Sequence, residues 1–320
     1  MLLSAFLGHN CFMHTAYLTH PACVRHDMGA EHPECPERLI AIHDRLVGQG
    51  TMDYLQSYTA QPATLAQLSR AHTSLYVDEV VNAAPTTGYL RLDPDTQMNS
   101  HTLEAALCAA GAVVQATDLV LSGTVQRAFC AVRPPGHHAE RSATMGFCFF
   151  NNAAVGIRHA LDVHGLERVL LVDFDVHHGN GSEDILANDE RVLMVSTFQT
   201  QLYPFSGENP LGKNMLNVPL PPRTGGDLLR QAVLNDWWPA VNAFKPQLIY
   251  VSAGFDAHLE DDMGNLGWRD ADYAWLSHEL VNMANTHCAG RLISTLEGGY
   301  AIAALARCVN QHVRILADLE

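Results

Sequence analysis

Two carboxylates and one histidine in this chain offer the donor atoms of a catalytic metal site. Asp175 and His177 are separated by one residue, and Asp256 lies far along the chain after a different apolar segment. Residues i and i+2 of an extended segment point to the same side, so Asp175 and His177 can reach one ion. Three protein ligands leave a fourth position for water or substrate, which is typical of catalytic zinc. An isolated Asp-x-His triplet has little specificity, and the prediction depends on the whole set of residues.

Adjacent histidines form a second chemical feature. His137 and His138 follow two prolines and a glycine at 134–136, which favour a tight, non-helical loop. An imidazole titrates near neutral pH, so this pair can supply a general base and an electrostatic partner. The alternatives are two surface histidines or two further metal ligands.

Four predicted strands must position these groups. Each strand is short and apolar and runs into a polar loop, and the four are Phe129 to Arg133, Arg168 to Val172, Gln247 to Ala253 and Arg291 to Leu296. The loops carry His137, Asp175, Asp256 and Tyr300, respectively. Open α/β sheets bind ligands outside the carboxyl ends of their strands. We therefore expect these side chains to meet in one cleft.

Predicted helices alternate with strands through the second half of the chain. The helices are Pro36 to Val47, Ser100 to Leu121, Asn152 to His164, Asp227 to Phe244 with a break expected near Pro239, Asp270 to Asn285, and Ala301 to Ala317. This alternation predicts an α/β fold with a doubly wound, mainly parallel sheet flanked by helices. With 320 residues, 48% of them hydrophobic, and no linker-like stretch, we expect a single domain over residues 1–320.

Charge and apolar patterning argue against two classes of function. The net charge is −15, with 19 basic against 34 acidic residues, so no basic stripe is available for nucleic acid. An acidic surface can steer cationic substrates, although it is also common in cytosolic proteins. No run approaches a membrane span of about twenty apolar residues, and Met1 to Gly8 is too short for a signal peptide. Eight cysteines without a CxxC pair favour free thiols. We expect a cytoplasmic protein with no membrane or nucleic-acid partner.

Five ordered sequence blocks resemble the signatures of zinc-dependent histone deacetylases. They are Arg-Pro-Pro-Gly-His-His at 133–138, Gly-Phe-Cys-Phe-Phe-Asn-Asn at 146–152, Asp-Phe-Asp-Val-His-His-Gly-Asn-Gly at 173–181, Ala-Gly-Phe-Asp at 253–256 and Glu-Gly-Gly-Tyr at 297–300. His-Pro-Glu-Cys-Pro-Glu-Arg-Leu at 32–39 resembles the N-terminal element of the family. This family also includes bacterial acetylpolyamine amidohydrolases and acetoin-utilisation proteins. The resemblance spans most of the chain and implies the arginase/deacetylase fold.

The resemblance also implies catalytic roles. The implied zinc ligands are Asp175, His177 and Asp256. His138 would be the general base that takes a proton from the attacking water, and His137, paired with Asp173, would tune the charge of the site. Tyr300 would donate its hydroxyl to the oxyanion formed at the acetyl carbonyl. Iron can replace zinc, because a site with two carboxylates and one imidazole is not strongly selective.

Two departures refine the expected chemistry and substrate. Asn180 stands where many members of the family place an aspartate behind the second histidine, so we expect a less basic His138 than in the aspartate-bearing branch. Met263 stands where polyamine-selective relatives carry a glutamate, and a methionine makes an apolar rim. The adjacent acidic residues 260–262 can attract cations or form a solvated loop. The Gly146 carbonyl would accept the amide N–H of the scissile bond.

Further implied contacts complete the expected site. Phe147 and Tyr203 would flank a narrow acyl-lysine-type channel. A monovalent cation, K⁺ or Na⁺, would sit beside the zinc in an oxygen cage built from Asp173, Ser196 and the backbone carbonyls of Asp175, His177 and Thr197.

Three functions are compatible with these residues. The leading hypothesis is a zinc amidohydrolase that acts on an acetylated peptide, protein or small amine, most simply an acetyl-lysine side chain, with an acetylpolyamine as the alternative substrate. A two-manganese ureohydrolase needs a further aspartate at the position of Gly179, which a glycine cannot replace. A catalytically weak binding protein of the same fold would lack a ligand, base or oxyanion donor, and all of these have candidates here.

Overall fold

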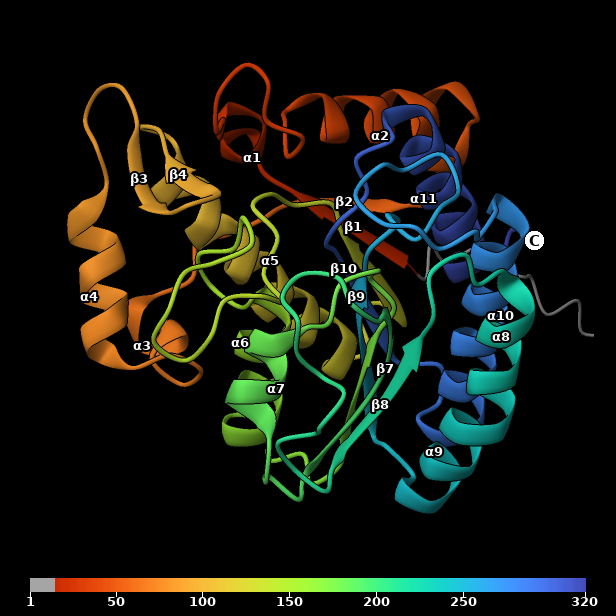
Figure 1. Cartoon of the computed structure of the whole chain (residues 1–320). Coiled ribbons are helices and arrows are strands. Elements are labelled where there is room, and N and C mark those ends of the chain that lie inside the picture. The colour runs from red at the N-terminus through yellow and green to blue at the C-terminus, as the bar shows by residue number, and fades with distance from the viewer. Residues whose placement is uncertain (1–14) are drawn as a thin grey trace, which may run out of the picture.

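The computed structural model describes residues 15–320, and one parallel β-sheet lies at its centre (Figure 1). Eight strands follow the order β2-β1-β5-β10-β9-β6-β7-β8, and every neighbouring pair is parallel. Their bounds are β1 Thr15–Thr19, β2 Gln56–Thr59, β5 Arg127–Cys130, β6 Val169–Asp173, β7 Val192–Gln199, β8 Met215–Leu220, β9 Leu248–Ala253 and β10 Leu292–Leu296. A separate antiparallel hairpin joins β3 Leu90–Asp93 to β4 Thr96–Met98. The predicted α/β class with a parallel sheet is confirmed.

Helices cover both faces of the sheet. In Figure 1, α5, α6 and α7 lie on one side of it, and α8, α9 and α10 lie on the other. The helices of the described residues are α1 Pro21–Arg25, α2 Glu37–Gly48, α3 Leu65–Leu68, α4 Ser74–Ala83, α5 Thr102–Leu121, α6 Asn152–Asp162, α7 Asn180–Leu186, α8 Gly226–Ala232, α9 Trp238–Phe244, α10 Asp270–His287 and α11 Ile302–Leu316. A 3₁₀ turn, η1, spans Thr51–Tyr54, and a π-helical segment, η2, spans Val233–Trp237. The expectation for Met1 to Gly8 lies outside the described residues.

The central strands are buried on both faces, which explains their continuous apolar sequences. Every residue of β6, β9 and β10 is buried. Layers of helices on both sides remove these strands from water, so no polar face is needed. Three of the four predicted strands therefore match the structure within one residue at each end.

The first predicted strand was placed too late in the chain. Phe129 to Arg133 was expected, whereas β5 ends at Cys130. Arg133 then turns its guanidinium to Glu34, with Nη2 2.7 Å from Oε2, and the two prolines that follow have no N–H to donate to a ladder. The chain therefore leaves the sheet before the histidine pair.

The expected break near Pro239 does not occur. Instead the chain passes from α8 through the π-helical η2 into α9, where Pro239 occupies the first turn. At this junction the N–H of Trp238 donates to the carbonyl of Val233, five residues earlier, and the wider π turn accommodates a proline that has no N–H of its own.

Helix α5 corrects the expectation that no segment approaches a membrane span. Thr102–Leu121 is the one helix of the described chain that is long and apolar enough to cross a membrane. Of its most apolar window, 67% is buried inside the protein, where α5 packs against α1, α6 and β5. Its apolar surface is thus that of a core helix.

Candidate active site

The implied metal ligands converge at the carboxyl edge of the sheet. Asp175 follows β6 and Asp256 follows β9, and these strands are neighbours. His177 Nδ1 lies 3.0 Å from Asp175 Oδ1 and 3.2 Å from Asp256 Oδ2. All three side chains are buried, and one donor atom from each lies within 4.8 Å of the others. Backbone N–H groups of Val176 and Gly298 hold the remaining carboxylate oxygens at 2.9 Å. The structure therefore brings together the three residues that the sequence placed in one cleft.

This donor set fits a divalent metal ion. Asp256 Oδ2 is buried and receives no hydrogen bond from residues 15–320. Burial and the neighbouring Asp175 carboxylate raise the pKa of Asp256 to about 7, because two buried negative charges repel each other. A divalent cation among these atoms would relieve that repulsion. Two carboxylate oxygens and one imidazole nitrogen are donor types that zinc accepts.

Asn180 fixes the proton on the ring of His138. The Nδ2 of Asn180 donates to Glu140 Oε1 at 2.8 Å, so its Oδ1 must face His138 Nδ1, 2.7 Å away. An amide oxygen can only accept, which places the ring hydrogen on Nδ1. The other nitrogen, Nε2, keeps its lone pair. His138 is thus arranged as a proton acceptor at Nε2.

The two adjacent histidines have opposite electrostatic surroundings. His137 Nδ1 lies 3.0 Å from Asp173 Oδ2, and its Nε2 lies 3.9 Å from Asp175 Oδ1. Burial alone would lower the pKa of His137, but Asp175 and Asp173 outweigh it and raise the pKa to about 10. Burial and the neighbouring imidazoles of His137 and His177 hold the pKa of His138 well below its usual value. The pair therefore has one favoured cation and one favoured neutral ring.

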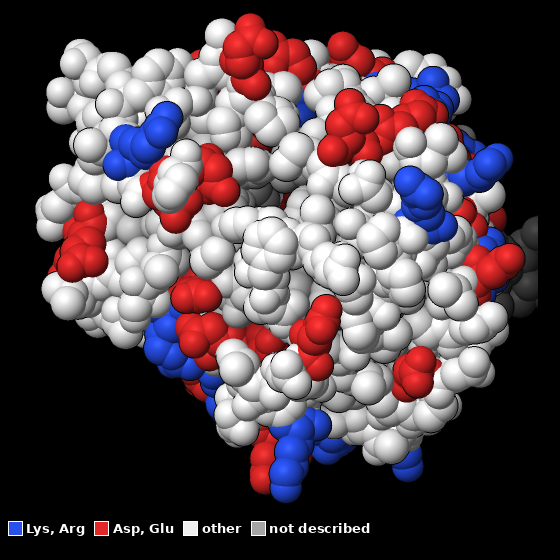
Figure 2. Space-filling model, viewed as in Figure 1, with Lys and Arg blue, Asp and Glu red and all other residues white. Residues whose placement is uncertain are grey.

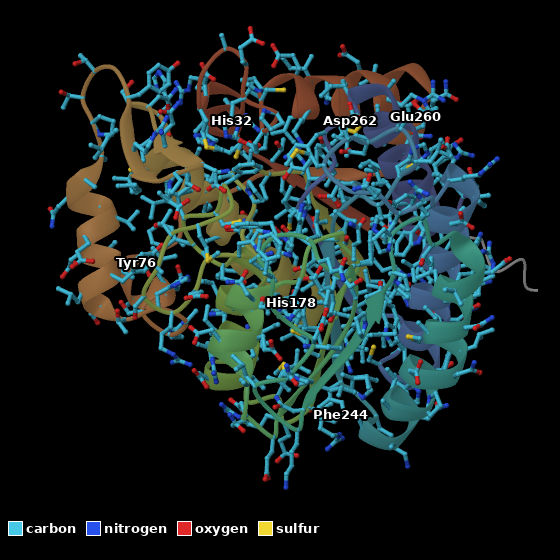
Figure 3. The ribbon with its side chains drawn as sticks, in the orientation of Figure 1. His32, Tyr76, His178, Phe244, Glu260 and Asp262 are labelled. Atoms are coloured by element: carbon cyan, nitrogen blue, oxygen red, sulfur yellow. The ribbon has the colours of Figure 1, made fainter. Side chains whose placement is uncertain are left out.

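A cavity of about 280 Å³ reaches His138 and His177. Its wall includes His138, Gly146, Phe147, Tyr203, Met263 and Tyr300. A Cβ at Gly146 would collide with the His138 ring, and φ of +55° at that residue favours glycine. Figure 2 shows a hollow near the centre of this face with acidic side chains on both sides of it. Figure 3 shows His32 and Asp262 in the layer of loops above the sheet.

Tyr300 is held by Asp261 and Arg38. Asp261 Oδ2 accepts the backbone N–H groups of Tyr300 at 2.6 Å and Ala301 at 2.8 Å. The guanidinium carbon of Arg38 lies 4.9 Å from the centre of the Tyr300 ring, and the Phe147 ring meets it edge-on at 5.9 Å. The block that ends in Tyr300 is therefore fixed by contacts from three separate parts of the chain.

The interpretation of residues 260–262 as one solvated or cation-attracting loop was wrong for Asp261, whereas Glu260 and Asp262 are exposed. Asp261 is 5% exposed and accepts three backbone N–H groups, including that of Met263. Glu260 forms an ion pair with Arg307 at 2.7 Å. The buried Asp261 is therefore the one member of this trio that the interpretation did not describe.

Sequence reasoning missed a buried polar network beneath the cavity. Glu34 pairs with Arg133 and with Arg38, although 99 residues separate Glu34 from Arg133. Glu297 accepts the N–H groups of Gly136 at 2.7 Å and His137 at 3.1 Å. Glu34, Arg133 and Glu297 all stand in the quoted blocks, but their pairing could not be read from them.

Asp95 is a second omission. It comes from the turn between β3 and β4 and lines the cavity with Phe147 and Tyr203. The Asp-Pro-Asp sequence at 93–95 marks a turn, and nothing in it indicates that this turn reaches the cavity.

Residues of the expected monovalent-cation cage are adjacent in the sheet. Ser196 of β7 is paired in register with Asp173 of β6, and its hydroxyl donates to Asn217 Oδ1 at 3.2 Å. Asp173 Oδ1 accepts the N–H of Asp175 at 3.1 Å. The buried Thr197 Oγ1 has no hydrogen-bond partner among the described residues.

Comparison with known proteins agrees with the motifs. Residues 32–316 match the histone deacetylase domain. The chain is 37% identical over 298 residues to a probable deacetylase of Archaeoglobus fulgidus, covering 91% of this chain and 82% of that protein. It is 35% identical over 315 residues to the histone deacetylase-like amidohydrolase of Pseudomonas aeruginosa, covering 95% and 83%. The crystal structure of the HDA15 HD domain superimposes with a TM-score of 0.89 at 31% identity, covering 95% of this chain and 88% of that one. This chain therefore belongs to the histone deacetylase family.

Proposed function

We propose that this chain is a zinc-dependent amidohydrolase that removes acetyl or other acyl groups from N-acylated amines, with acetyl-lysine-type side chains as the leading substrate. The observation that carries this proposal is the arrangement around one cavity. His177 of the three-ligand cluster, His138 with its Nε2 lone pair available, and Tyr300 line the same cavity. Hydrolysis of an amide needs an activated water, a polarised carbonyl and a proton for the departing amine, and each has a candidate here.

Each residue of the proposed site has a separate role in hydrolysis. Asp175, His177 and Asp256 would hold zinc, which would supply Lewis-acid polarisation of the carbonyl and lower the pKa of water. Nε2 of His138 takes a proton from the attacking water and returns it to the amine nitrogen as the C–N bond breaks. Tyr300 donates its hydroxyl to the carbonyl oxygen as negative charge develops there. The products are the carboxylate of the acyl group and the free amine.

The cavity wall supports a slender acyl-amine chain. Phe147 and Tyr203 present aromatic surface to that chain, and the Gly146 carbonyl is the proposed acceptor for the amide N–H. The cavity wall also includes one apolar side chain, that of Met263, and one acidic side chain, that of Asp95. Asp95 favours an acetylpolyamine as a second candidate substrate, because its carboxylate would face the free ammonium groups.

Further features of the proposal concern ions and location. Asp173, Ser196 and the backbone carbonyls of residues 175, 177 and 197 would hold K⁺ or Na⁺ beside the zinc. Fe²⁺ can take the place of the zinc. The seven described cysteines are free, which supports a reducing, cytoplasmic setting.

The test compares hydrolysis of an acetyl-lysine peptide and of N-acetylputrescine by the zinc-loaded chain. Tyr300→Phe is the control, since it removes only the hydroxyl and should lower turnover by about two to four orders of magnitude while zinc stays bound. Peptide turnover that depends on Tyr300 supports the leading function, and preference for acetylputrescine supports the second. No turnover of either amide would contradict the deacetylase proposal and favour a binding protein of the same fold.

A further inference from the structure

A second group of side chains that can bind a metal ion lies at the other end of the strands, near the carboxyl ends of two helices. Asp118 is near the end of α5, His159 is near the end of α6, and His164 follows α6 just before β6 begins. The donor atoms of these three side chains lie within 4.8 Å of one another. Helices α5 and α6 pack against each other (Figure 1). We call these three residues the α5–α6 cluster.

Both imidazoles of the cluster point the same nitrogen at one carboxylate oxygen. Asp118 Oδ1 lies 2.8 Å from His159 Nε2 and 2.7 Å from His164 Nε2. The two rings are 5.2 Å apart at 77° to each other. Each oxygen of a carboxylate can accept two hydrogen bonds. The two Nε2 atoms and Asp118 Oδ1 therefore converge within reach of one ion.

We propose that Asp118, His159 and His164 bind a borderline divalent transition-metal ion such as Zn²⁺, at a site separate from the catalytic centre. Two imidazoles and one carboxylate are a ligand set that suits such ions and leaves a position for water. The proposal does not depend on the proposed hydrolase activity.

The geometry needs only a small adjustment to accept the ion. Metal–nitrogen and metal–oxygen bonds of about 2.0–2.2 Å in a tetrahedron separate neighbouring donors by about 3.3 Å. The carboxylate must therefore retreat by roughly half an ångström from each nitrogen. The Asp118 side chain is 55% exposed and can move outward, whereas His159, at 7%, stays fixed against the core. His164 is 29% exposed, so the ion can reach the cluster from solvent.

The positive charge of the neighbouring Arg70 opposes a bound cation, and this gives the proposal a second test. Arg70 Nη1 lies 3.2 Å from His159 Nδ1. An arginine can only donate, so in this arrangement Nδ1 accepts and Nε2 carries the ring hydrogen. A metal at Nε2 moves that hydrogen to Nδ1, where it faces a second donor. Arg70 is only partly buried and must swing aside, and its removal should strengthen metal binding.

The remaining cluster of this type carries no comparable inference. His258, Asp270 and Cys308 also lie within reach of one ion. There Arg307 binds both carboxylate oxygens of Asp270, at 2.8 and 3.3 Å, and already neutralises it.

The test measures zinc content after equilibrium dialysis of the full chain that already carries its catalytic zinc. We expect the wild-type chain to hold one zinc more than His164→Ala and Asp118→Asn. His278→Ala is the matched control, because this exposed histidine of α10 is not part of the cluster, and it should retain the full content. Arg70→Gln should bind the additional zinc about tenfold more tightly, since glutamine can accept the hydrogen at Nδ1.

Several results would overturn the proposal. Equal zinc content in wild type and in both cluster variants would show that the three residues form only a hydrogen-bonded group. Unchanged or weaker binding in Arg70→Gln would contradict the proton rearrangement at His159. As a control, equal unfolding temperatures of wild type and His164→Ala, each with only its catalytic zinc, would show that the lost zinc does not come from misfolding. Zinc should then raise the unfolding temperature of wild type more than that of His164→Ala.

Discussion

Asp261→Asn tests whether the position of Tyr300 depends on a buried carboxylate that contacts no substrate. One oxygen of Asp261 accepts the N–H groups of Tyr300 and Ala301, and the other accepts the N–H of Met263 at 3.0 Å. Asparagine has a single acceptor oxygen. Whichever way its amide turns, the NH₂ group faces a backbone donor on one side.

The expected loss follows from the hydrogen bonds that the amide cannot make. A hydrogen bond to a charged group contributes about 1.5–3 kcal/mol. If the lost hydrogen bond displaces the Tyr300 hydroxyl, the same energy is added to the activation free energy of the reaction. Turnover then falls by about 10- to 150-fold, because each 1.36 kcal/mol is a factor of ten. KM should change less, since Asp261 lies behind the cavity wall.

The assay measures kcat, KM and zinc content for Asp261→Asn and for Asp262→Asn. Asp262 is the exposed neighbour, and its variant should retain wild-type turnover. If Asp261→Asn keeps kcat within twofold at full zinc content, Asp261 does not position Tyr300.

Three other perturbations have defined outcomes. Asp256→Ala should abolish binding of the catalytic zinc, and full occupancy by elemental analysis would refute its assignment as a ligand. Gly111→Ala should destabilise the fold by about 1–3 kcal/mol in chemical denaturation, because a Cβ there collides with the Gln61 carbonyl, whereas Gly48→Ala, with open space around it, should be neutral or stabilising. Burial lowers the pKa of His72 to about 4, against about 6.5 unfolded, so the unfolded chain binds more protons between these values. The difference adds about 3 kcal/mol to the free energy of unfolding above pH 6.5, and this is lost as the pH falls towards 4. If His72→Gln shows the same pH dependence of stability as wild type, His72 is not the cause.

The strands that carry the candidate metal site were predictable because burial on both faces leaves a continuous apolar sequence. Val169–Asp173 and Leu248–Ala253 show that pattern. Edge strands do not, and β2, Gln56–Thr59, has partly buried and exposed residues in alternation with no apolar run. The order of the strands could not be read either, because it depends on which distant segments pair.

Helix α7 was missed because local propensity does not favour it. Asn180–Leu186 begins with asparagine, glycine and serine, which are weak helix formers. Contacts from distant residues replace that propensity. A Cβ at Gly181 would collide with the Ala139 carbonyl, so the helix packs against the histidine loop at the position where only glycine fits. The residues that orient the site were visible as motifs, whereas the helix that carries Asn180 was visible only in the fold.

The same tertiary contacts explain how two identical, adjacent side chains acquire different chemistry. His137 turns towards the end of β6, where Asp173 supplies a carboxylate, and His138 turns towards α7, where Asn180 supplies an amide. A carboxylate stabilises a positive ring, whereas an amide orients a ring without adding charge. Glu140 completes this distinction, because it binds the NH₂ of Asn180 and leaves only the amide oxygen for His138. Replacing Glu140 with glutamine would weaken that constraint, since a glutamine can accept or donate, and only the weak acceptor Met145 Sδ, 3.2 Å from Asn180 Nδ2, would then hold the amide in place. The separation of roles between the two histidines therefore depends partly on Glu140, which acts on His138 through Asn180.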